Sequence, residues 1–553
     1  MDTHTRNKLK HLDVDSNKIT DQQTRRDVCL LLDGVEKFAT ENEQLKEHIQ
    51  KLKDEINHLK GEQGKPNIRP QKKDGDISSE NERNKKIKKP AKKKSKKNTV
   101  EVNKTQKCCI NPSSLPDDAV FKGYDSVVIQ DITIKPDNIK FEREVYYSPS
   151  LGKRFMAPLP LGYEGEYGPS IKSFILTLYN DSKITQPALH RLLNTVGIDI
   201  SKATISRIIT DGVSIFHSEK LSIVRAGIAS TDYQHIDDTG ARVNGKNHYT
   251  HVLCNPFYTA YFTRSSKDRL TVLKILAGGS LIFHLNEASL DLMKNMGLLK
   301  KHLSKVQKNN HEPKVLNEEE INAFIDSLFP EQSTHQLHRK KIKEACALVA
   351  YQNQDEAIKI LLCDDAPQFK NLTEFLMLCW IHEARHYKKL TPFRKANQDK
   401  TDCVISQIWE FYHSLQDYQK APNEKLSVEL AKKFDSLFEQ RTDYKELDAR
   451  IQKTKNKKDR LLLVLKYPHL PLHNNSAELG ARAQARKRDI SLQTKNKKGT
   501  EAKDTMMTIV GTAEKLGVNV MDYIFDRVSK AFKMPALSEV IAQISQQRIL
   551  DTG

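Results

Sequence analysis

The feature that most constrains the fold is a short apolar run that ends in two adjacent acids. Residues 358–363 are apolar except for Lys359, and a run of this length between polar residues is typical of a buried strand. Asp364 and Asp365 follow at once, and Pro367 stops a regular continuation. A carboxylate at the carboxyl end of a buried strand is a usual place for active-site chemistry in α/β folds. The alternative is a plain strand–loop–helix whose acids are only solvated.

Two further acidic positions stand out. Residues 233–243, YQHIDDTGARV, predict a strand closed by Asp237 and Asp238 that begins an antiparallel meander. Glu478 lies on a late predicted helix that Asn475 can cap, and Asn475 with Glu478 also fits a capping box. Two carboxylates on adjacent strands and one on a helix can hold two divalent cations, and oxygen ligands suit Mg²⁺ or Mn²⁺.

Residues 28–60 carry a heptad repeat. Its apolar seam alternates in steps of four and three from Leu31 to Leu59, with β-branched residues at a and mostly Leu at d. Asn42 occupies an a position, where a buried Asn fixes register and dimeric state. The repeat predicts a parallel two-stranded coiled coil. The alternative is an amphipathic helix packed on its own globular domain.

The charge balance favours a polyanionic partner. Lys and Arg number 90 against 71 Asp and Glu, a formal net charge of +19. Residues 85–97 contain nine lysines, among them Lys92, Lys93 and Lys94, and such a block stays disordered and binds polyanions without sequence preference. It resembles a nuclear-localisation run, but a basic linker is the simpler interpretation. The alternative for the whole chain is a soluble protein with one basic tail.

A helical tract follows residue 163. Helices are predicted over 171–179 and 186–195, and Ser201 is expected to cap a third. This spacing is that of a helix-turn-helix, with Lys202, Thr204 and Arg207 free to face DNA. An ordinary three-helix packing unit fits the pattern equally well.

The remaining composition bounds the compartment. The eight cysteines show no CxxC pair, Cys108 and Cys109 have no second pair, and a zinc site is not predicted there. No apolar run approaches the ~20 residues that span a bilayer, and the N-terminus lacks a secretory signal. We therefore expect a cytoplasmic protein with no membrane partner. Weak alternation predicts short strands at 127–134 and 141–147.

One short motif suggests a different chemistry. His382, Glu383 and His386 match HExxH, in which two histidines on a helix bind Zn²⁺ and the glutamate acts as the base of a peptidase. Five-residue patterns of this kind also arise by chance. The zinc peptidase is therefore the lesser alternative.

Several segments resemble those of transposases of the insertion-sequence 66 family. LGYEGEYGPSIKSF resembles the family's entry into its helix-turn-helix-like region. HIDDTGARV resembles its first acidic motif at Asp237, and LLCDDAPQF its second at Asp364, with Asp365 a close competitor. CWIHEARHY resembles the Cys-Trp-x-His-x-x-Arg signature, which includes His382, and LHNNSAELGAR the Asn-Asn-x-x-Glu motif at Glu478. The resemblance covers most of the chain from about residue 145 to 525.

The resemblance implies a ribonuclease H-like catalytic domain with a DDE triad. Asp237, Asp364 and Glu478 are then the catalytic and metal-binding residues, with two Mg²⁺ or Mn²⁺ ions. The implied reaction is hydrolysis of a phosphodiester at the element end, followed by attack of the freed 3′-hydroxyl on target DNA. The implied partners are double-stranded DNA, a homodimer or higher oligomer, and helper proteins, in a bacterial, nucleoid-associated setting. A catalytically inactive DNA-binding regulator derived from such an enzyme is the first alternative, which the intact acids disfavour.

Other positions are candidates of second rank or of DNA contact. The side chains expected beside the triad are Asp238, Asp365 and His382. The basic residues expected to contact DNA after Glu478 are Arg482, Arg486 and Arg488. The chain departs from the family in lacking paired cysteines before the YEGEYG segment, in having Leu479 after the glutamate and Asp489-Ile490 further on, and in a longer stretch between the first two acids.

These observations give one predicted organisation. The fold class is α/β, a ribonuclease H-like mixed sheet core with large helical insertions, preceded by a coiled coil and a helix-turn-helix-like region. The predicted segments are a coiled-coil helix at 1–60, a basic linker at 61–107, a small β-rich region at 108–160, a helical DNA-binding region at 161–225, core at 226–279, a helical insertion at 280–355, core at 356–395, a second insertion at 396–466, the last core helices at 467–525 and a C-terminal tail at 526–553.

Overall fold

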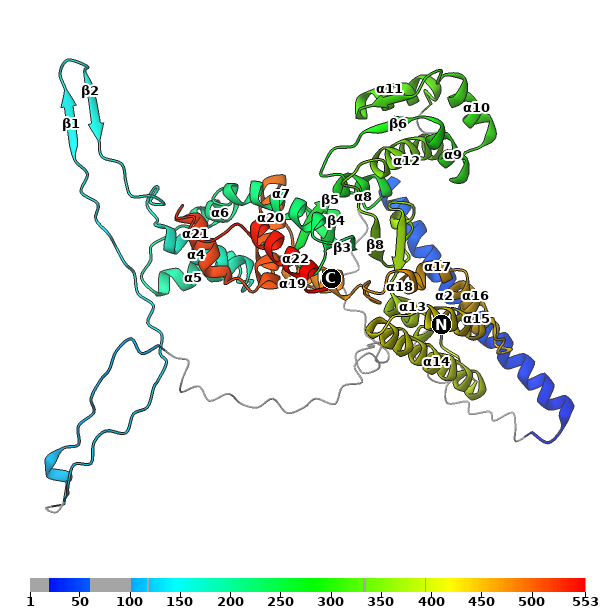
Figure 1. Cartoon of the computed structure of the whole chain (residues 1–553), viewed down its shortest axis with the longest axis horizontal. Helices are drawn as coiled ribbons and strands as arrows, with labels where there is room; N and C mark the ends of the chain where they lie inside the picture. Colours follow the sequence, from blue (N-terminus) through cyan, green and yellow to red (C-terminus); the bar gives the residue numbers. More distant parts are fainter. Residues whose placement is uncertain (1–18, 60–100, 117–118, 332–334, 393, 553) are drawn as a thin grey trace.

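The computed structural model describes residues 19–59, 101–116, 119–331, 335–392 and 394–552 (Figure 1). The strands are β1 (Val145–Ser148), β2 (Lys153–Met156), β3 (Tyr233–Val243), β4 (Lys246–Cys254), β5 (Thr259–Arg264), β6 (Phe283–Leu285), β7 (Lys314–Leu316), β8 (Ile360–Cys363) and β9 (Phe375–Leu378). Before β3 lie the helices α2 (Gln22–Leu59), η3 (Pro112–Ser114), α4 (Pro169–Asn180), α5 (Gln186–Thr195), α6 (Lys202–Thr210) and α7 (Ser214–Ala229).

Two helical insertions and a C-terminal group follow. Between β5 and β8 lie α8 (Arg269–Leu276), α9 (Glu287–Asn295), α10 (Lys300–Lys308), α11 (Glu318–Leu328) and α12 (Gln336–Gln352). From β8 onward come η4 (Pro367–Phe369), α13 (Trp380–Lys388), α14 (Lys395–Lys420), α15 (Glu424–Glu439), α16 (Lys445–Lys455), α17 (Lys458–Leu461) and α18 (Leu463–Lys466). The chain ends in α19 (Asn475–Ser491), α20 (Lys497–Leu516), α21 (Val520–Val528) and α22 (Leu537–Thr552).

A five-stranded mixed sheet forms the centre, with strand order β5-β4-β3-β8-β9. β3, β4 and β5 make the antiparallel meander that the sequence predicts, while β8 pairs parallel with β3 and β9 parallel with β8. All four residues of β8 are buried, as expected for a strand with neighbours on both sides and helices on both faces. The α/β prediction with a mixed sheet is confirmed.

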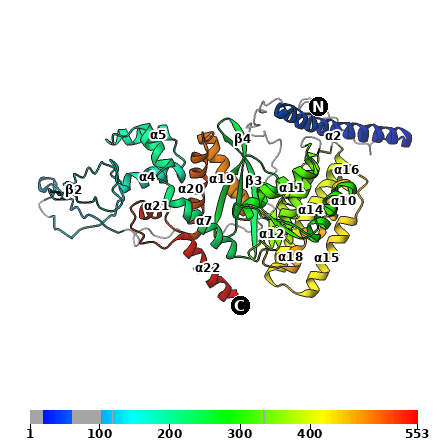
Figure 2. The ribbon, with the colours of Figure 1, turned by 90° about the horizontal axis from the view of Figure 1, so that it is seen from above.

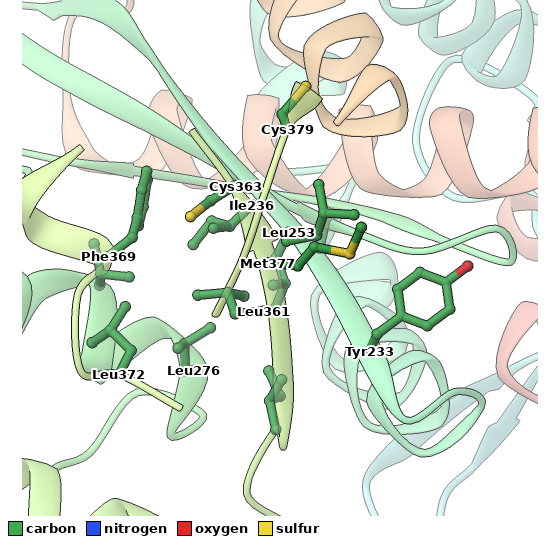
Figure 3. Close-up of a cluster of buried hydrophobic side chains, with 14 of the residues drawn as sticks. Tyr233, Ile236, Leu253, Leu276, Leu361, Cys363, Phe369, Leu372, Met377 and Cys379 are labelled. Carbon is green, nitrogen blue, oxygen red and sulfur yellow. The ribbon is translucent and has the colours of Figure 1, made fainter. Parts of the chain in front are cut away.

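Apolar side chains from β3, β4, β8 and β9 form the core under this sheet. Ile236, Leu253, Leu361 and Met377 converge in one cluster, and Cys379 lies just past the end of β9 (Figure 3). In two views, α19 and α20 lie on one side of β3 and β4, and the helices of the two insertions lie on the other (Figures 1 and 2). The edge that carries the predicted acids therefore lies between these two helical groups.

Helix α20 covers the free edge of β5. Its side chains Asp504, Thr508 and Thr512, spaced by four residues, accept hydrogen bonds from the backbone N–H groups of Thr263, Tyr261 and Thr259, at 2.5, 3.1 and 3.3 Å. Four helical residues rise about 6 Å and two strand residues about 6.8 Å, so the two repeats stay nearly in step. An edge that would otherwise present unpaired N–H groups is closed by side chains of the same chain.

The helical region before the sheet follows the prediction closely. Helix α5 has the bounds that the sequence indicates, and the Ser201 side chain accepts a hydrogen bond from the Thr204 N–H at 3.1 Å to cap α6. The residues expected as a C-terminal tail, 526–553, contain the end of α21 and all of α22, and these two helices pack against α4 and α7. Leu537 and Ile541 of α22 are fully buried, so this end is part of the same packed unit.

Two sequence predictions differ from the structure. The strand predicted at 127–134 is wrong, because these residues form no regular element and their side chains are exposed; the hairpin is β1–β2, which starts at Val145. β3 does not end at Asp237 but continues to Val243, because β4 pairs along its whole length. The insertion before β8 contains a small β6–β7 hairpin beside its helices.

In the described part of α2, the seam of the heptad repeat is exposed. Leu31, Phe38 and Leu45 are 71, 71 and 59% exposed. A coiled coil remains a prediction, since it requires a second copy of this helix and the structure is that of a single chain.

Candidate active site

The parallel pairing of β3 and β8 brings two of the predicted acids together. The register pairs His235 with Leu362, so two residues further along Asp237 comes level with Asp364. β8 ends at Cys363, and Asp237 therefore lies at the carboxyl edge of the parallel pair although it is in the middle of β3. The sequence placed both acids at strand ends; the structure places both at one edge for this different reason.

Both carboxyl groups are disfavoured as anions. Burial, and next the neighbouring charge of Asp364, raise the pKa of Asp237 to about 7. Burial also raises the pKa of Asp364, although the backbone N–H of Ala366 donates a hydrogen bond to this carboxylate at 3.1 Å. Two half-buried acids with raised pKa values at one edge are an arrangement that cations would relieve.

Glu478 reaches the same edge from the first turn of α19. Its carboxylate also raises the pKa of Asp237, but less than burial and the charges of Asp364 and Asp238 do. Its nearest partners are basic: Arg385 Nη1 lies 3.3 Å from Oε2, His382 Nδ1 lies 3.6 Å from Oε1, and Arg482 Nη2 lies 3.7 Å from Oε2. Glu478 is thus held toward α13.

The capping role for Glu478 is not what the structure has. The N-cap of α19 is Asn474, one residue before the predicted Asn475, and its side chain makes no capping hydrogen bond. The Glu478 N–H instead donates to the Asn474 carbonyl at 3.1 Å, an ordinary helical bond. The Glu478 side chain therefore does not cap this helix, and its partners are the basic side chains of α13 and α19.

Asn474 ties the start of α19 to β3 and to the start of α13. Its Oδ1 pairs with His235 Nδ1 at 2.9 Å, and its Nδ2 donates to the carbonyl of Ile236, the residue before Asp237, at 2.8 Å. Its backbone N–H donates to Cys379 Sγ at 3.1 Å. Asn474 is fully buried. Sequence reasoning missed this residue, although it is the first Asn of the Asn-Asn-x-x-Glu motif and could have been singled out there.

The neighbouring acids Asp238 and Asp365 have different partners. Asp238 accepts a hydrogen bond from Gln368 Nε2 at 2.7 Å, and Lys267 Nζ lies 3.6 Å away. Asp365 is paired with Lys457 at 2.8 Å and with Arg460 at 3.3 Å. Burial raises the pKa of Asp365, but Lys457 outweighs it and the pKa lies below its usual value. Of each adjacent pair, the first acid is the better candidate.

The three acids are not yet gathered around a common point. Among the described residues, one group of at least three His, Cys, Asp or Glu side chains has ligand atoms within 4.8 Å of one another, and it consists of Cys379, His382 and Glu478. His382, a secondary candidate from the sequence, is a member of this group. Burial lowers the pKa of His382 and raises that of the Cys379 thiol to about 11.

The HExxH residues are not gathered into a peptidase site. Glu383 is buried and paired with Arg450, it accepts a hydrogen bond from Thr454 at 2.6 Å, and Lys457 lies 3.0 Å away. A carboxylate with these partners is not available as a base. Burial lowers the pKa of His386 to about 4, and this residue is not in the ligand group of His382.

The predicted DNA-contacting residues separate into exposed and structural ones. Lys202 and Arg207 are exposed on α6, whereas Thr204 is half-buried and accepts a hydrogen bond from Arg207 at 3.1 Å. On α19, Arg482 and Arg486 are exposed, but Arg488 is half-buried and donates to the Gly240 carbonyl of β3 at 2.5 Å. Lys92, Lys93 and Lys94 lie outside the described residues.

The comparisons with known proteins each cover part of the chain. A protein of Sinorhizobium fredii (strain NBRC 101917 / NGR234), "Uncharacterized protein y4jO", is 29% identical over 313 residues, which are 55% of this chain and 94% of that protein. The described helices include none that is long and apolar enough to traverse a bilayer. Residues 323–502, which include Asp364, α13 and Glu478, match the family described as Transposase IS66 family. Over these residues the chain is similar to transposases of the IS66 family.

Proposed function

We propose that the protein is a DNA transposase that hydrolyses a phosphodiester at the ends of its element and joins the freed 3′-hydroxyl to target DNA. The observation that carries the proposal is the meeting of Asp237 and Asp364 at the carboxyl edge of β3 and β8, with Glu478 beside them on α19. The family match supports the reaction class. The mixed sheet is consistent with the ribonuclease H-like core that we propose for it.

The donor set fits hard divalent cations. Three carboxylates offer oxygen ligands, and the raised pKa of Asp237 means that its charge is unfavourable without a counter-ion. We propose that Asp237, Asp364 and Glu478 hold two Mg²⁺ or Mn²⁺ ions. When bound, such ions polarise the phosphate and lower the pKa of water.

The residues around Glu478 control its orientation. Arg385 and His382 hold its carboxylate toward α13 in this structure, so Glu478 must exchange these partners to share a cation with the two aspartates. Asn474 keeps β3, Cys379 and α19 in fixed relation while this side chain turns. The backbone frame of the site is thus rigid, and one side chain is its adjustable part.

DNA binding is proposed for the exposed basic side chains of α6 and α19. Lys202 and Arg207 project from α6, the third helix of the α4–α6 unit. The other face of α6 carries the buried Ile205, Ile208 and Ile209.

Replacing Lys202 and Arg207 with Ala should weaken binding to the element end more than binding to random duplex, by about 1–3 kcal/mol per specific contact. Equal losses on both duplexes in a fluorescence-anisotropy titration would contradict base-specific readout. Lys425→Ala and Lys432→Ala, at exposed lysines of α15, are the matched controls.

A homodimer through α2 is part of the same proposal. The exposed seam at Leu31, Phe38 and Leu45, with Asn42 at an a position, favours a second copy of this helix as its partner. Deleting residues 22–59 should convert a dimer into a monomer in sedimentation equilibrium. A deleted protein that stays dimeric would place the interface elsewhere. Helper proteins and a cytoplasmic, nucleoid-associated setting complete the proposal.

The deciding experiment is strand cleavage on a labelled duplex that carries the end of the encoding element. We expect nicking with Mg²⁺ or Mn²⁺, no nicking with EDTA, and recovery when Mg²⁺ is restored. A protein that binds the element end tightly but never cuts it would instead be the inactive regulator. Cleavage that survives EDTA would contradict the role proposed for the three acids.

A further inference from the structure

The side chains of Cys379, His382 and Glu478 form a compact group of mixed chemistry. Their ligand atoms all lie within 4.8 Å of one another. Cys379 is the N-cap of α13 and His382 lies in its first turn, three residues later, while Glu478 lies in the first turn of α19. The two helix starts are fixed to each other, because the Trp380 N–H donates to the Leu472 carbonyl at 3.0 Å and the Asn474 N–H to Cys379 Sγ at 3.1 Å.

We propose that Cys379, His382 and Glu478 are a binding site for one thiophilic divalent ion of the Zn²⁺ class. This ion would compete for Glu478 with the hard ions of the catalytic site. The competition rests on the proposed function, but the binding site itself does not. Neither the zinc-peptidase motif nor the three-acid site contains this combination of ligands.

The ligand types separate this site from the catalytic one. A thiolate and an imidazole with one carboxylate suit Zn²⁺ or Co²⁺, whereas Mg²⁺ and Mn²⁺ favour oxygen ligands alone. The 3.6 Å between His382 Nδ1 and Glu478 Oε1 is close to the spacing of two ligands on one tetrahedral ion, for metal–ligand bonds of about 2.0–2.2 Å. His382 Nδ1 is buried and makes no hydrogen bond in the described structure, so it is open to a ligand role.

Three protein ligands leave a fourth position open. The side chain of His382 is 29% exposed and that of Glu478 is 11% exposed, so water can reach the ion. Cys379 is buried and lies just past the end of β9 (Figure 3). Arg385 must leave Glu478 when the ion binds. Its side chain is 28% exposed, so it can turn into solvent. The thiol proton of Cys379 is displaced to water as the Cys379–metal bond forms.

The consequence is a choice between two states of Glu478. With the thiophilic ion bound, the carboxylate stays on α13 and is withheld from Asp237 and Asp364. Without it, the carboxylate can turn to the aspartates. Low Zn²⁺ should therefore inhibit cleavage that excess Mg²⁺ supports, by removing a catalytic ligand.

The binding arm uses the metal-free full-length protein and Co²⁺ alone, without DNA. A thiolate bound to Co²⁺ gives a charge-transfer absorption in the near ultraviolet, and we expect one equivalent of Co²⁺ to produce it. Cys379→Ser, His382→Gln and Glu478→Gln should each weaken binding at least tenfold, and Cys379→Ser should abolish the band. The exposed thiols supply matched controls, Cys403→Ser and the double variant Cys108→Ser/Cys109→Ser, which should keep it.

The outcomes decide the proposal independently of catalysis. Absence of the band, its persistence in Cys379→Ser, or unchanged affinity in His382→Gln would each overturn the site. If Cys379→Ser fails to fold by circular dichroism, zinc X-ray absorption on the wild-type protein decides instead, with one sulfur and one imidazole ligand expected and an all-oxygen shell contradicting it.

The activity arm measures inhibition by Zn²⁺ at fixed Mg²⁺, with each variant normalised to its own rate. His382→Gln should raise the inhibiting Zn²⁺ concentration at least tenfold. Equal sensitivity of wild type and variant would overturn the competition while leaving the binding result to stand on its own. Absence of any cleavage in the wild-type protein would overturn the proposed function instead, and the competition with it.

Discussion

Adjacent acids in this chain have opposite electrostatic surroundings. Asp237 and Asp364 lie at the carboxyl edge of the parallel pairing of β3 and β8, and we call them the strand-end pair. Neither has a Lys, Arg or His nitrogen within 4.0 Å in the part of the chain that the structure describes. Asp365 and Glu383, the ion-paired acids, share Lys457, and each has an arginine as well. Asp364 and Asp365 are consecutive in the chain, yet the pKa of the first is raised and that of the second is lowered.

The difference separates acids that join helices through internal ion pairs from acids that have no cation within the protein. Glu383 and Asp365 join α13 and the end of β8 to the helices α16 and α17 through internal cations, so their charge is already neutralised. The strand-end pair costs stability as long as nothing neutralises it. Asp237 and Asp364 are half-buried and have no internal cation, so they are the acids that the proposed divalent ions would neutralise.

The largest effect that tests this comparison is on catalysis. Asp237→Asn, Asp364→Asn and Glu478→Gln should each lower the rate of strand cleavage by about a thousandfold, which corresponds to about 4 kcal/mol of lost transition-state stabilisation. Asp238→Asn and Asp365→Asn should lower it by no more than about tenfold, because these carboxylates already have partners within the protein. The measurement is single-turnover nicking under excess Mg²⁺, with binding to the element end checked separately.

A reversed order within either adjacent pair would break the comparison. If Asp365→Asn were as damaging as Asp364→Asn while folding and DNA binding persisted, the ion-paired acid would be the ligand. Near-normal cleavage by Glu478→Gln would remove the third acid from the proposed site.

The second effect is on stability and concerns the ion-paired acids. Glu383→Gln leaves Arg450 without its carboxylate and Lys457 with Asp365 alone, and both cations are nearly buried, at 12 and 11% exposure. Breaking one side of a buried pair typically costs 3–5 kcal/mol, so we expect the free energy of unfolding to fall by about 3 kcal/mol. Urea unfolding followed by tryptophan fluorescence reports this directly, since Trp380 lies in α13 and Trp409 lies in α14.

The matched control is Asp435→Asn, whose pair with Lys458 is 39 and 34% exposed. An exposed pair contributes about 0–1 kcal/mol, so this variant should unfold close to the wild type. A loss for Glu383→Gln no larger than for Asp435→Asn would show that the ion-paired acids do not hold α13 and α16 together.

Local sequence patterns predicted much of this arrangement. The apolar run before Asp364 predicted β8 and the Ser201 cap predicted α6, because each depends on neighbours within a few residues. Helix α20 ends at Gly517, which has a φ of +70° that glycine adopts without strain.

What the sequence could not predict depends on partners far apart in the chain. The ion pairs of Asp365 are made with Arg460 and Lys457, more than 90 residues later. The orientation of Glu478 is set by Arg385, and the importance of Asn474 by its bonds to β3 and α13. The length of β3 is set by its pairing with β4, which outweighs the predicted stop at Asp237.

The smallest of the three effects is the pH dependence of stability that the strand-end pair imposes. Folded Asp237 keeps its proton up to about pH 7, whereas the unfolded chain releases it near the ordinary value of 3.8. Between these values the folded state binds more protons, so the free energy of unfolding of the metal-free protein should fall as the pH rises from about 4 to about 7. The full shift corresponds to about 4 kcal/mol, and solvent access and coupling to Asp364 reduce the expected change to about 2 kcal/mol.

Asp237→Asn should remove this decline and be about 2 kcal/mol more stable than wild type at pH 8. Adding Mg²⁺ should likewise raise the free energy of unfolding of the wild-type protein at this pH. Asp238→Asn, at a carboxylate already bound by Gln368, should retain the wild-type slope. Parallel pH profiles for wild type and Asp237→Asn in EDTA would mean that the strand-end pair carries no unrelieved charge, and the contrast with the ion-paired acids would then have no energetic basis.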